Sequence, residues 1–159
     1  MMLSENNKDL TLTTEDGIFN HRIGYLIFQK DTVLLQKGTE DDGFWFIPGG
    51  RVQFGETSQQ ALKREVKEEL GITLEKFHLS IIVENHFKHN KSNCHEIGLY
   101  YTVTAAKNFD CPKYDEKGNT VIFAWHRINT LQSITLKPTF FQTRMPEFQS
   151  GVHHIIHRE

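Results

Sequence analysis

The stretch GRVQFGETSQQALKREVKEELGI, residues 50–72, decides the fold because it contains a helix whose two ends are both marked. Thr57 is suited to the N-cap position, and Gln60 follows three residues later, as a capping box requires. Gly71, directly after Leu70, is the residue type that most often closes a helix in the left-handed conformation. The sequence therefore predicts a helix that begins after Thr57 and ends at Gly71.

Three glutamates share one face of this predicted helix. At about 100° per residue, Glu68 lies about 60° to one side of Glu65, and Glu69 lies about 40° to the other. The neighbouring stripe is apolar and consists of Leu62, Val66 and Leu70. The acidic side chains are therefore expected to border the hydrophobic core instead of pointing into bulk solvent.

A solvated acidic face is the ordinary interpretation of such a charge run, but it fits Glu65 and Glu69 poorly. These two side chains form a like-charge pair, and carboxylates about 6 Å apart repel by roughly 2 to 3 kcal/mol at an effective dielectric constant of about 20. Arg64 can pair with a carboxylate, but one guanidinium does not neutralise three acids. Oxygen ligands suit Mg²⁺ or Mn²⁺, whereas thiolates or imidazoles would indicate zinc or copper. We therefore interpret the three acids as a site for a hard divalent cation.

Strands are predicted on both sides of this helix. Before it, the pattern suggests a hairpin around Lys30-Asp31 and a short strand stopped by Pro48-Gly49-Gly50. A second helix is expected to begin near Pro138 and to stop before Pro146. The predicted strands cover residues 22–28, 33–36, 44–47, 72–87, 95–104 and 120–128, with a weak edge strand at 152–157 and polar loops at 38–43 and 106–119. Together these elements predict an α/β fold with a mixed β-sheet between helices.

Length and charge limit the class of protein. The 159 residues show no repeat or linker, so we expect one domain over residues 18–159, preceded by a polar N-terminal segment, residues 1–17. The formal net charge of −2 gives no basic surface for wrapping nucleic acid, which is not an expected partner. No signal peptide or membrane span is found, so the expectation is a cytoplasmic protein without a membrane partner. A homodimer is possible, because the sequence does not determine the oligomeric state.

The cysteines and histidines do not match a known metal knuckle. Cys94 and Cys111 are the only cysteines, and we interpret both as free thiols. The run His86, His89, Cys94 and His95 has irregular spacing, which favours a surface turn over a zinc site.

Taken as a whole, residues 50–72 resemble the Nudix box, the signature of the Nudix hydrolase family with its MutT-like members. The matching positions are Gly50, Glu56, Arg64, Glu65, Val66, Glu68, Glu69, Gly71 and Ile72, and nothing in the box departs from the pattern. Residues 45–49 also resemble the strand that leads into this box. The resemblance implies an α/β/α sandwich that hydrolyses a diphosphate linkage in a nucleoside diphosphate derivative, with Mg²⁺ or Mn²⁺ as cofactor and a small-molecule nucleotide as partner.

The resemblance also implies roles for individual residues. The metal ligands would be Glu65, Glu68, Glu69 and the carbonyl of Gly49. Glu56 and Arg64 would orient that set from behind. One carboxylate must accept the proton of the attacking water. Glu65 is the first choice for this catalytic role, and Glu96, on the predicted strand 95–104, is the alternative.

Three residues at the start of the box or just before it are candidates for substrate binding. Arg51 follows Gly50 and is placed to meet a phosphate, although an exposed arginine beside a loop is often only solvated. Trp45 and Phe46 can stack on a base, although aromatic residues of a strand more often form core or pocket wall.

Two other functions are compatible with the same resemblance. A non-catalytic nucleotide-binding regulatory module has no need to keep all three acids. An isoprenyl diphosphate isomerase needs an activated cysteine, and neither cysteine has a setting that suggests activation. Segments of the ADP-ribose and dinucleoside polyphosphate subgroups carry a Pro or Tyr after the box, and none occurs between Thr73 and Leu99. Oxidised nucleoside triphosphates, sugar nucleotides, coenzyme fragments and capped RNA stay open, the last disfavoured by the absent basic patch.

Overall fold

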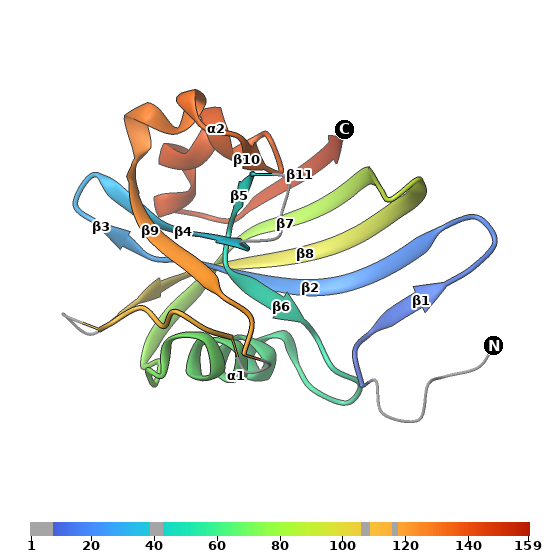
Figure 1. Cartoon of the computed structure of the whole chain (residues 1–159), viewed down its shortest axis with the longest axis horizontal. Helices are drawn as coiled ribbons and strands as arrows, with labels where there is room; N and C mark the ends of the chain where they lie inside the picture. Colours follow the sequence, from blue (N-terminus) through green and yellow to red (C-terminus); the bar gives the residue numbers. More distant parts are fainter. Residues whose placement is uncertain (1–7, 39–42, 106–108, 116–117) are drawn as a thin grey trace.

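The strands form two β-sheets in the computed structural model, which describes residues 8–38, 43–105, 109–115 and 118–159 (Figure 1). The larger sheet has the order β1-β2-β8-β7-β11, and β6 pairs with β2 beside it. Its strands are β1 (Thr11–Thr13), β2 (Ile18–Leu26), β6 (Gly49–Arg51), β7 (Lys76–His89), β8 (Ser92–Thr104) and β11 (His153–Arg158). The smaller sheet has the order β10-β5-β4-β3, with β9 paired to β4. Its strands are β3 (Phe28–Gln29), β4 (Thr32–Gly38), β5 (Trp45–Phe46), β9 (Val121–Arg127) and β10 (Leu136–Lys137).

Parallel and antiparallel pairs occur together, so the predicted mixed sheet is confirmed. β2 runs parallel to β8 and β11 parallel to β7, whereas β7 and β8 form a long antiparallel hairpin. The helical segments of the described chain are α1 (Ser58–Leu70), α2 (Phe141–Arg144) and two 3₁₀ helices, η1 (Ile128–Ser133) and η2 (Met145–Gln149). Figure 1 shows α1 on one side of the sheets and the C-terminal helices on the other. The α/β class is therefore confirmed, with the strands divided between two sheets where the sequence suggested one.

The ends of α1 lie where the sequence placed them. The Gln60 amide donates to the Thr57 hydroxyl at 3.2 Å, and the Thr57 amide donates to the Gln60 side chain at 2.7 Å. Gly71 closes the helix with φ of 72°. Both predictions succeed because they rest on contacts within a few residues of the chain.

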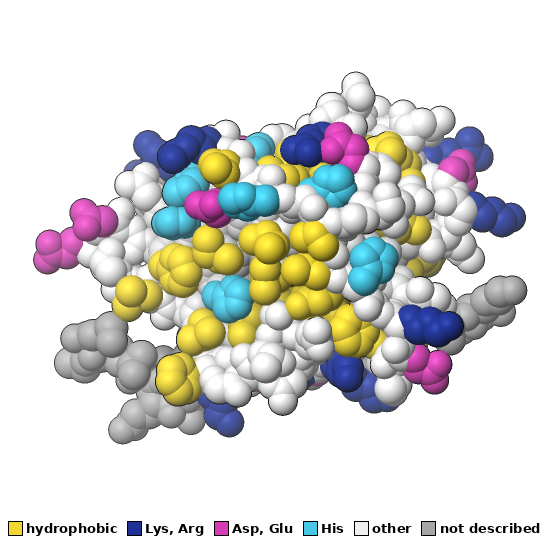
Figure 2. All heavy atoms as spheres, turned by 180° about the vertical axis from the view of Figure 1, so that it is seen from behind, with side chains coloured by type: hydrophobic (Ala, Val, Ile, Leu, Met, Phe, Trp, Pro, Cys, Tyr) yellow, Lys and Arg dark blue, Asp and Glu magenta, His cyan; other side chains and the backbone are white. Residues whose placement is uncertain are grey.

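The two faces of the larger sheet pack against different layers. On the inner face, Ile81, Val83 and Tyr100 pack against Phe141 and Phe148 of the C-terminal helices. On the outer face, Tyr25 and Tyr101 of the sheet pack with Leu62 and Val66 of α1. The molecule seen from behind carries a broad area of hydrophobic and histidine side chains at its surface (Figure 2). Within the described residues, no helix is both long and apolar enough to span a bilayer.

Several elements differ from the sequence predictions. Only the end of the first predicted strand forms the hairpin around Lys30: β3 pairs with β4, whereas β2 joins the larger sheet. The sequence placed a stop at Pro48-Gly49-Gly50, but the two glycines begin β6 because β2 offers an open edge. The second helix begins at Phe141 instead of near Pro138, and it continues into a 3₁₀ helix that includes Pro146. β1 and β10 were not predicted. The predicted edge strand at 152–157 is confirmed as β11.

Candidate active site

The helix α1 places its acidic residues beside its buried stripe. Ala61, Leu62, Val66 and Leu70 are the buried residues of this helix. The Glu65 side chain is 13% exposed and that of Glu68 is 32% exposed, while Glu69 is half-buried. The acids therefore border the core, as their angular spacing predicted.

Arg64 connects these acids to the neighbouring segments. Its guanidinium donates through Nε and Nη2 to both carboxylate oxygens of Glu56, at 2.9 and 3.0 Å. Nη1 donates to Glu65 at 2.6 Å and to Glu68 at 3.1 Å, and Nη2 also donates to the backbone carbonyl of Arg51 at 3.0 Å. The hydrogen bonds from Arg64 lower the pKa of Glu56. Arg64 thus bonds α1 both to Glu56 and to the backbone of β6.

Among the three acids, Glu69 has the pKa that departs furthest from its ordinary value. Burial raises the pKa of its carboxyl group to about 8, although the hydrogen bond donated by the Tyr25 hydroxyl at 2.5 Å lowers it. The charge of Glu65 raises it further, as does a hydrogen bond between the two side chains. Burial also raises the pKa of Glu65. Two adjacent carboxyl groups whose pKa values are raised in a half-buried setting form a site at which a cation would be stabilised.

The glycines before the helix make room for these carboxylates. A β-carbon on Gly50 would overlap the carboxylate of Glu65, and one on Gly49 would overlap the backbone of Ile23 and Gly24. Gly49 has a backbone φ of 154°, a value that residues with a side chain rarely adopt. The absence of a side chain at Gly50 therefore lets the backbone of β6 lie close to the Glu65 carboxylate.

Gly50→Ala should displace the Glu65 carboxylate and lower the activity of the protein. We expect a decrease of about 10- to 100-fold, because the resemblance implies that Glu65 is a metal ligand and such losses usually follow when the orientation of a ligand is disturbed. The measurement is turnover under metal saturation, with thermal melting to show that the variant is folded. Gln59→Ala, on an exposed position of the same helix, is the matched control, and equal activity of the two variants would show that the Gly50 contact is unimportant.

The acids line a cavity of about 270 Å³ between α1 and the smaller sheet. The other lining residues are Gln36, Pro112, Tyr114, Asp115, Asn119, Val121 and Phe123. The side-chain oxygen of Gln36 is buried and has no hydrogen-bond partner. Gln36 lies on β4 opposite Phe46 and Phe123, so a polar group faces the acids from the second sheet. Sequence reasoning missed Gln36 because nothing local to β4 indicates what it faces.

The oxygen ligands of this site fit a divalent cation, but they are not already arranged as a cage. Within the part of the chain that the structure describes, no three His, Cys, Asp or Glu side chains surround a common point. Glu65 and Glu68 instead share Arg64, and Glu69 bonds to Tyr25. The candidate donors are all oxygen atoms, which Mg²⁺ and Mn²⁺ prefer. The single positive charge of Arg64 does not balance the three carboxyl groups.

The three candidate substrate-binding residues lie outside the lining of the acid cavity. Arg51 is exposed, with a guanidinium nitrogen 3.8 Å from a carboxylate oxygen of Asp9. Trp45 packs edge-on against His126, with ring centroids 4.3 Å apart, and Lys37 lies over its ring. Phe46 pairs with Gln36 across β4 and β5. Glu96, the alternative proton acceptor, lies on β8 and also outside this lining.

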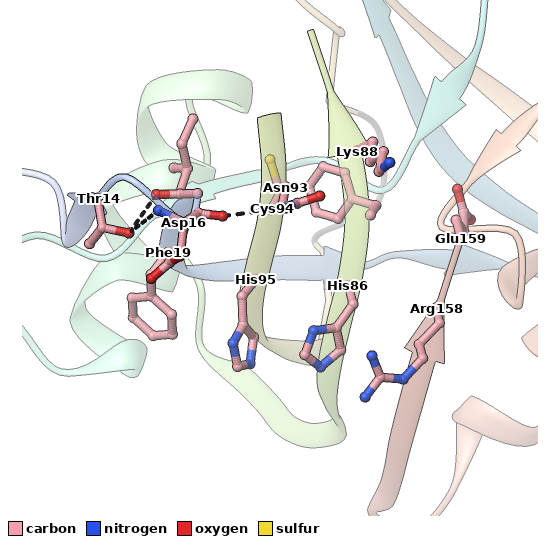
Figure 3. Close-up of a pocket in the computed structure, with 13 residues that line it drawn as sticks. Thr14, Asp16, Phe19, His86, Lys88, Asn93, Cys94, His95, Arg158 and Glu159 are labelled. Carbon is pink, nitrogen blue, oxygen red and sulfur yellow. Dashed lines mark hydrogen bonds between the residues drawn. The ribbon is translucent and has the colours of Figure 1, made fainter. Parts of the chain in front are cut away.

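A larger hollow, of about 500 Å³, lies at the far end of the larger sheet and contains none of the box residues (Figure 3). His86 and His95 lie side by side there, with ring centroids 4.2 Å apart. Cys94 points away from both histidines (Figure 3). The connection between β7 and β8 is a tight turn in which Asn90 and Lys91 have positive φ. The acid cavity, and not this hollow, carries the chemistry that the box implies.

The site thus consists of an acidic helix on one side of two mixed sheets, with two glycines of β6 beside its carboxylates. The NUDIX domain model matches residues 19–146, and the chain belongs to the Nudix family. The solved structure of a MutT protein from Bacillus halodurans shares the fold, with a TM-score of 0.64 at 21% sequence identity, over 86% of this chain and 90% of that chain. A MutT NUDIX hydrolase from Burkholderia pseudomallei gives a TM-score of 0.57 at 26% identity, over 69% and 84% of the two chains. The family and fold implied by the resemblance are thereby confirmed.

Two curated relatives indicate the range of the family. Human 8-oxo-dGDP phosphatase NUDT18 is 42% identical over 52 residues, which are 32% of this chain and 16% of the human protein. The 8-oxo-dGTP diphosphatase of Buchnera aphidicola is 29% identical over 108 residues, which are 68% of this chain and 80% of that protein. The match to the human protein therefore spans only a small part of its length.

Proposed function

We propose that this protein hydrolyses a phosphoric anhydride bond in a nucleoside di- or triphosphate derivative, with Mg²⁺ or Mn²⁺ as cofactor. The observation that carries the proposal is the set of three carboxylates on one face of α1, beside its buried stripe and lining one cavity. Burial, with a smaller contribution from the charge of Glu65, raises the pKa of Glu69 to about 8. The Nudix family is generally dependent on divalent metals, which agrees with this donor set.

The residues that would hold the cation are Glu65, Glu68, Glu69 and the Gly49 carbonyl. When bound, a divalent cation screens the anionic phosphate oxygens and lowers the pKa of a water molecule. The hydrogen bonds from Arg64 to Glu56 fix the position of α1 relative to the segment that precedes it. We assign proton acceptance from the attacking water to Glu65, because burial raises the pKa of its carboxyl group and makes it a stronger base.

The names of relatives narrow the substrates to be tested. The human and Buchnera proteins are an 8-oxo-dGDP phosphatase and an 8-oxo-dGTP diphosphatase, and a relative from Ruthia magnifica, 42% identical over 55 residues, is an RNA pyrophosphohydrolase. A nucleoside phosphate with a purine base is therefore the first substrate class to examine, and RNA with a 5′-triphosphate is the second.

A nucleotide panel tests the proposal directly. With Mg²⁺ or Mn²⁺, we expect release of phosphate or pyrophosphate from at least one nucleoside di- or triphosphate, and no release after chelation of the metal. The panel should contain ordinary and 8-oxidised purine nucleotides, sugar nucleotides and 5′-triphosphorylated RNA. Nucleotide binding without any hydrolysis across the panel would instead support the non-catalytic regulatory module.

A further inference from the structure

A row of polar side chains crosses the inner face of the larger sheet, next to the hydrophobic core. Asn20, Glu96 and Asn85 occupy neighbouring positions on β2, β8 and β7. They are 7%, 7% and 4% exposed. In Figure 3, Cys94 points away from His95, and Glu96 follows Cys94 by two residues, so Glu96 lies on the same face as Cys94. We call these three residues the polar row.

Groups in and beside the polar row lack the partners that burial demands. The side-chain oxygen of Asn85 is buried without a hydrogen bond, and so is Nε of Arg22. In the residues that the structure describes, Glu96 is the only carboxylate that is buried this deeply, and it forms no ion pair. Buried polar groups are nearly always paired, and an unpaired one costs roughly 1 to 3 kcal/mol. A ligand with a polar edge would satisfy these groups.

Arg22 connects the polar row to the metal-site acids. It lies opposite Arg51 of β6, the strand whose glycines adjoin Glu65. Burial lowers its pKa, but Tyr100, Glu96, Glu69 and Glu65 together raise the pKa above its usual value. Glu96 is two residues further along the sheet, about 7 Å at the usual rise per residue. The charges of Glu96, Glu69 and Glu65 thus all act on one guanidinium, and this is the observation that joins the polar row to the acids.

The chemistry of the row selects among bases. An ionised carboxylate only accepts hydrogen bonds, and the free Asn85 oxygen is also an acceptor. The Watson–Crick edge of guanine presents two adjacent donors, N1–H and N2–H, which match both oxygens of a carboxylate. Adenine presents an acceptor, N1, beside its single amino group, so it would place a lone pair against Glu96. Oxidation of guanine at C8 leaves this edge unchanged.

We propose that Glu96 is the specificity-determining residue of the nucleotide site and accepts the two adjacent N–H donors of a guanine base, with Asn85 beside it. The inference rests on the proposed nucleotide hydrolysis and adds the base that is read. Arg22, which only donates, faces acceptor atoms of the same nucleotide. Under this assignment Glu96 is a base-reading residue and not the alternative proton acceptor.

The test compares binding of GMP, IMP and AMP, which requires no turnover, in the presence of Mg²⁺. We expect calorimetry on the wild-type protein to give GMP about 10-fold tighter than IMP, which lacks the amino group, and about 100-fold tighter than AMP. Glu96→Gln should reduce this preference for GMP over AMP to within about 3-fold, and Glu96→Asp should give an intermediate ratio. Glu84→Gln is the control, because Glu84 lies on the opposite face of β7 and bonds to His154.

The outcomes separate this proposal from the proposed hydrolysis. A wild-type protein without preference for GMP, or a Glu96→Gln variant that melts like the wild type and retains the preference, would overturn the base-reading role. If Glu96→Gln lowered turnover equally on guanine and adenine nucleotides, the base-reading role would also be overturned, because a proton acceptor would serve both bases alike. GMP selectivity that depends on Glu96 in a protein without hydrolytic activity would support the subsite while rejecting the proposed hydrolysis.

Discussion

Glu69→Gln is expected to abolish nucleotide hydrolysis, with a fall in kcat/KM on the order of 10³-fold or more, about 4 kcal/mol of transition-state stabilisation. The substitution removes a negative oxygen from the metal-binding set while keeping the shape of the side chain. Its amide oxygen can still accept the hydrogen bond from the Tyr25 hydroxyl, so the packing against β2 should persist. The measurement is steady-state turnover at saturating Mg²⁺ or Mn²⁺. Activity within 10-fold of the wild type would remove Glu69 from the site.

The same variant should be more stable than the wild type in metal-free buffer at alkaline pH. Burial raises the pKa of Glu69 from 4.5 to about 8 in the folded protein, so the folded state holds a proton that the unfolded chain has released between these values. The free energy of unfolding of the wild type should therefore fall as the pH rises from about 4.5 to 8. The amide introduced by Glu69→Gln does not titrate, and we expect the variant to gain on the order of 2 kcal/mol at pH 8 with little difference at pH 4. Chemical denaturation at the two pH values, with chelator present, measures this difference.

Divalent cations should stabilise the wild-type protein strongly. A cation present at about 100 times its dissociation constant adds about 2.7 kcal/mol, which for a chain of this size raises Tm by about 5 to 10 °C. The increase should be larger at pH 8 than at pH 6, because the cation must displace the proton that burial retains on Glu69. Thermal melting across a Mg²⁺ or Mn²⁺ titration measures it. A Tm that does not move up to millimolar metal would favour the solvated acidic face.

Local signals in the sequence were enough to predict the helix and its acidic face. Thr57, Gln60 and Gly71 act on neighbours along the chain, so their contacts can be read before any tertiary structure is known. The face shared by Glu65 and Glu69 follows from helical geometry alone. The same reasoning failed for the start of α2. Which residues become helical there depends on the packing of Phe141 and Phe148 against the inner face of the larger sheet.

The missed parts of the site depend on residues that are distant in sequence. Gln36 faces the acids only because β4 and β9 form a second sheet over α1. The sequence shows Arg22 only as a polar residue of a strand. Its position between β6 and β8 follows from strand pairing that the sequence does not reveal. Trp45 is a stacking candidate because of its local aromatic character, and the sequence did not indicate that its ring packs edge-on against His126. Periodicity within one strand does not specify which element covers it.

The most direct test of the metal site is calorimetric titration of Mn²⁺ into the wild-type protein, Glu69→Gln and Glu84→Gln at pH 8. The acidic face of α1 predicts saturable binding to the wild type and to Glu84→Gln, and a loss of affinity of about 10- to 100-fold or more in Glu69→Gln. Equal Mn²⁺ affinity in all three proteins, or no measurable binding to the wild type, would contradict it.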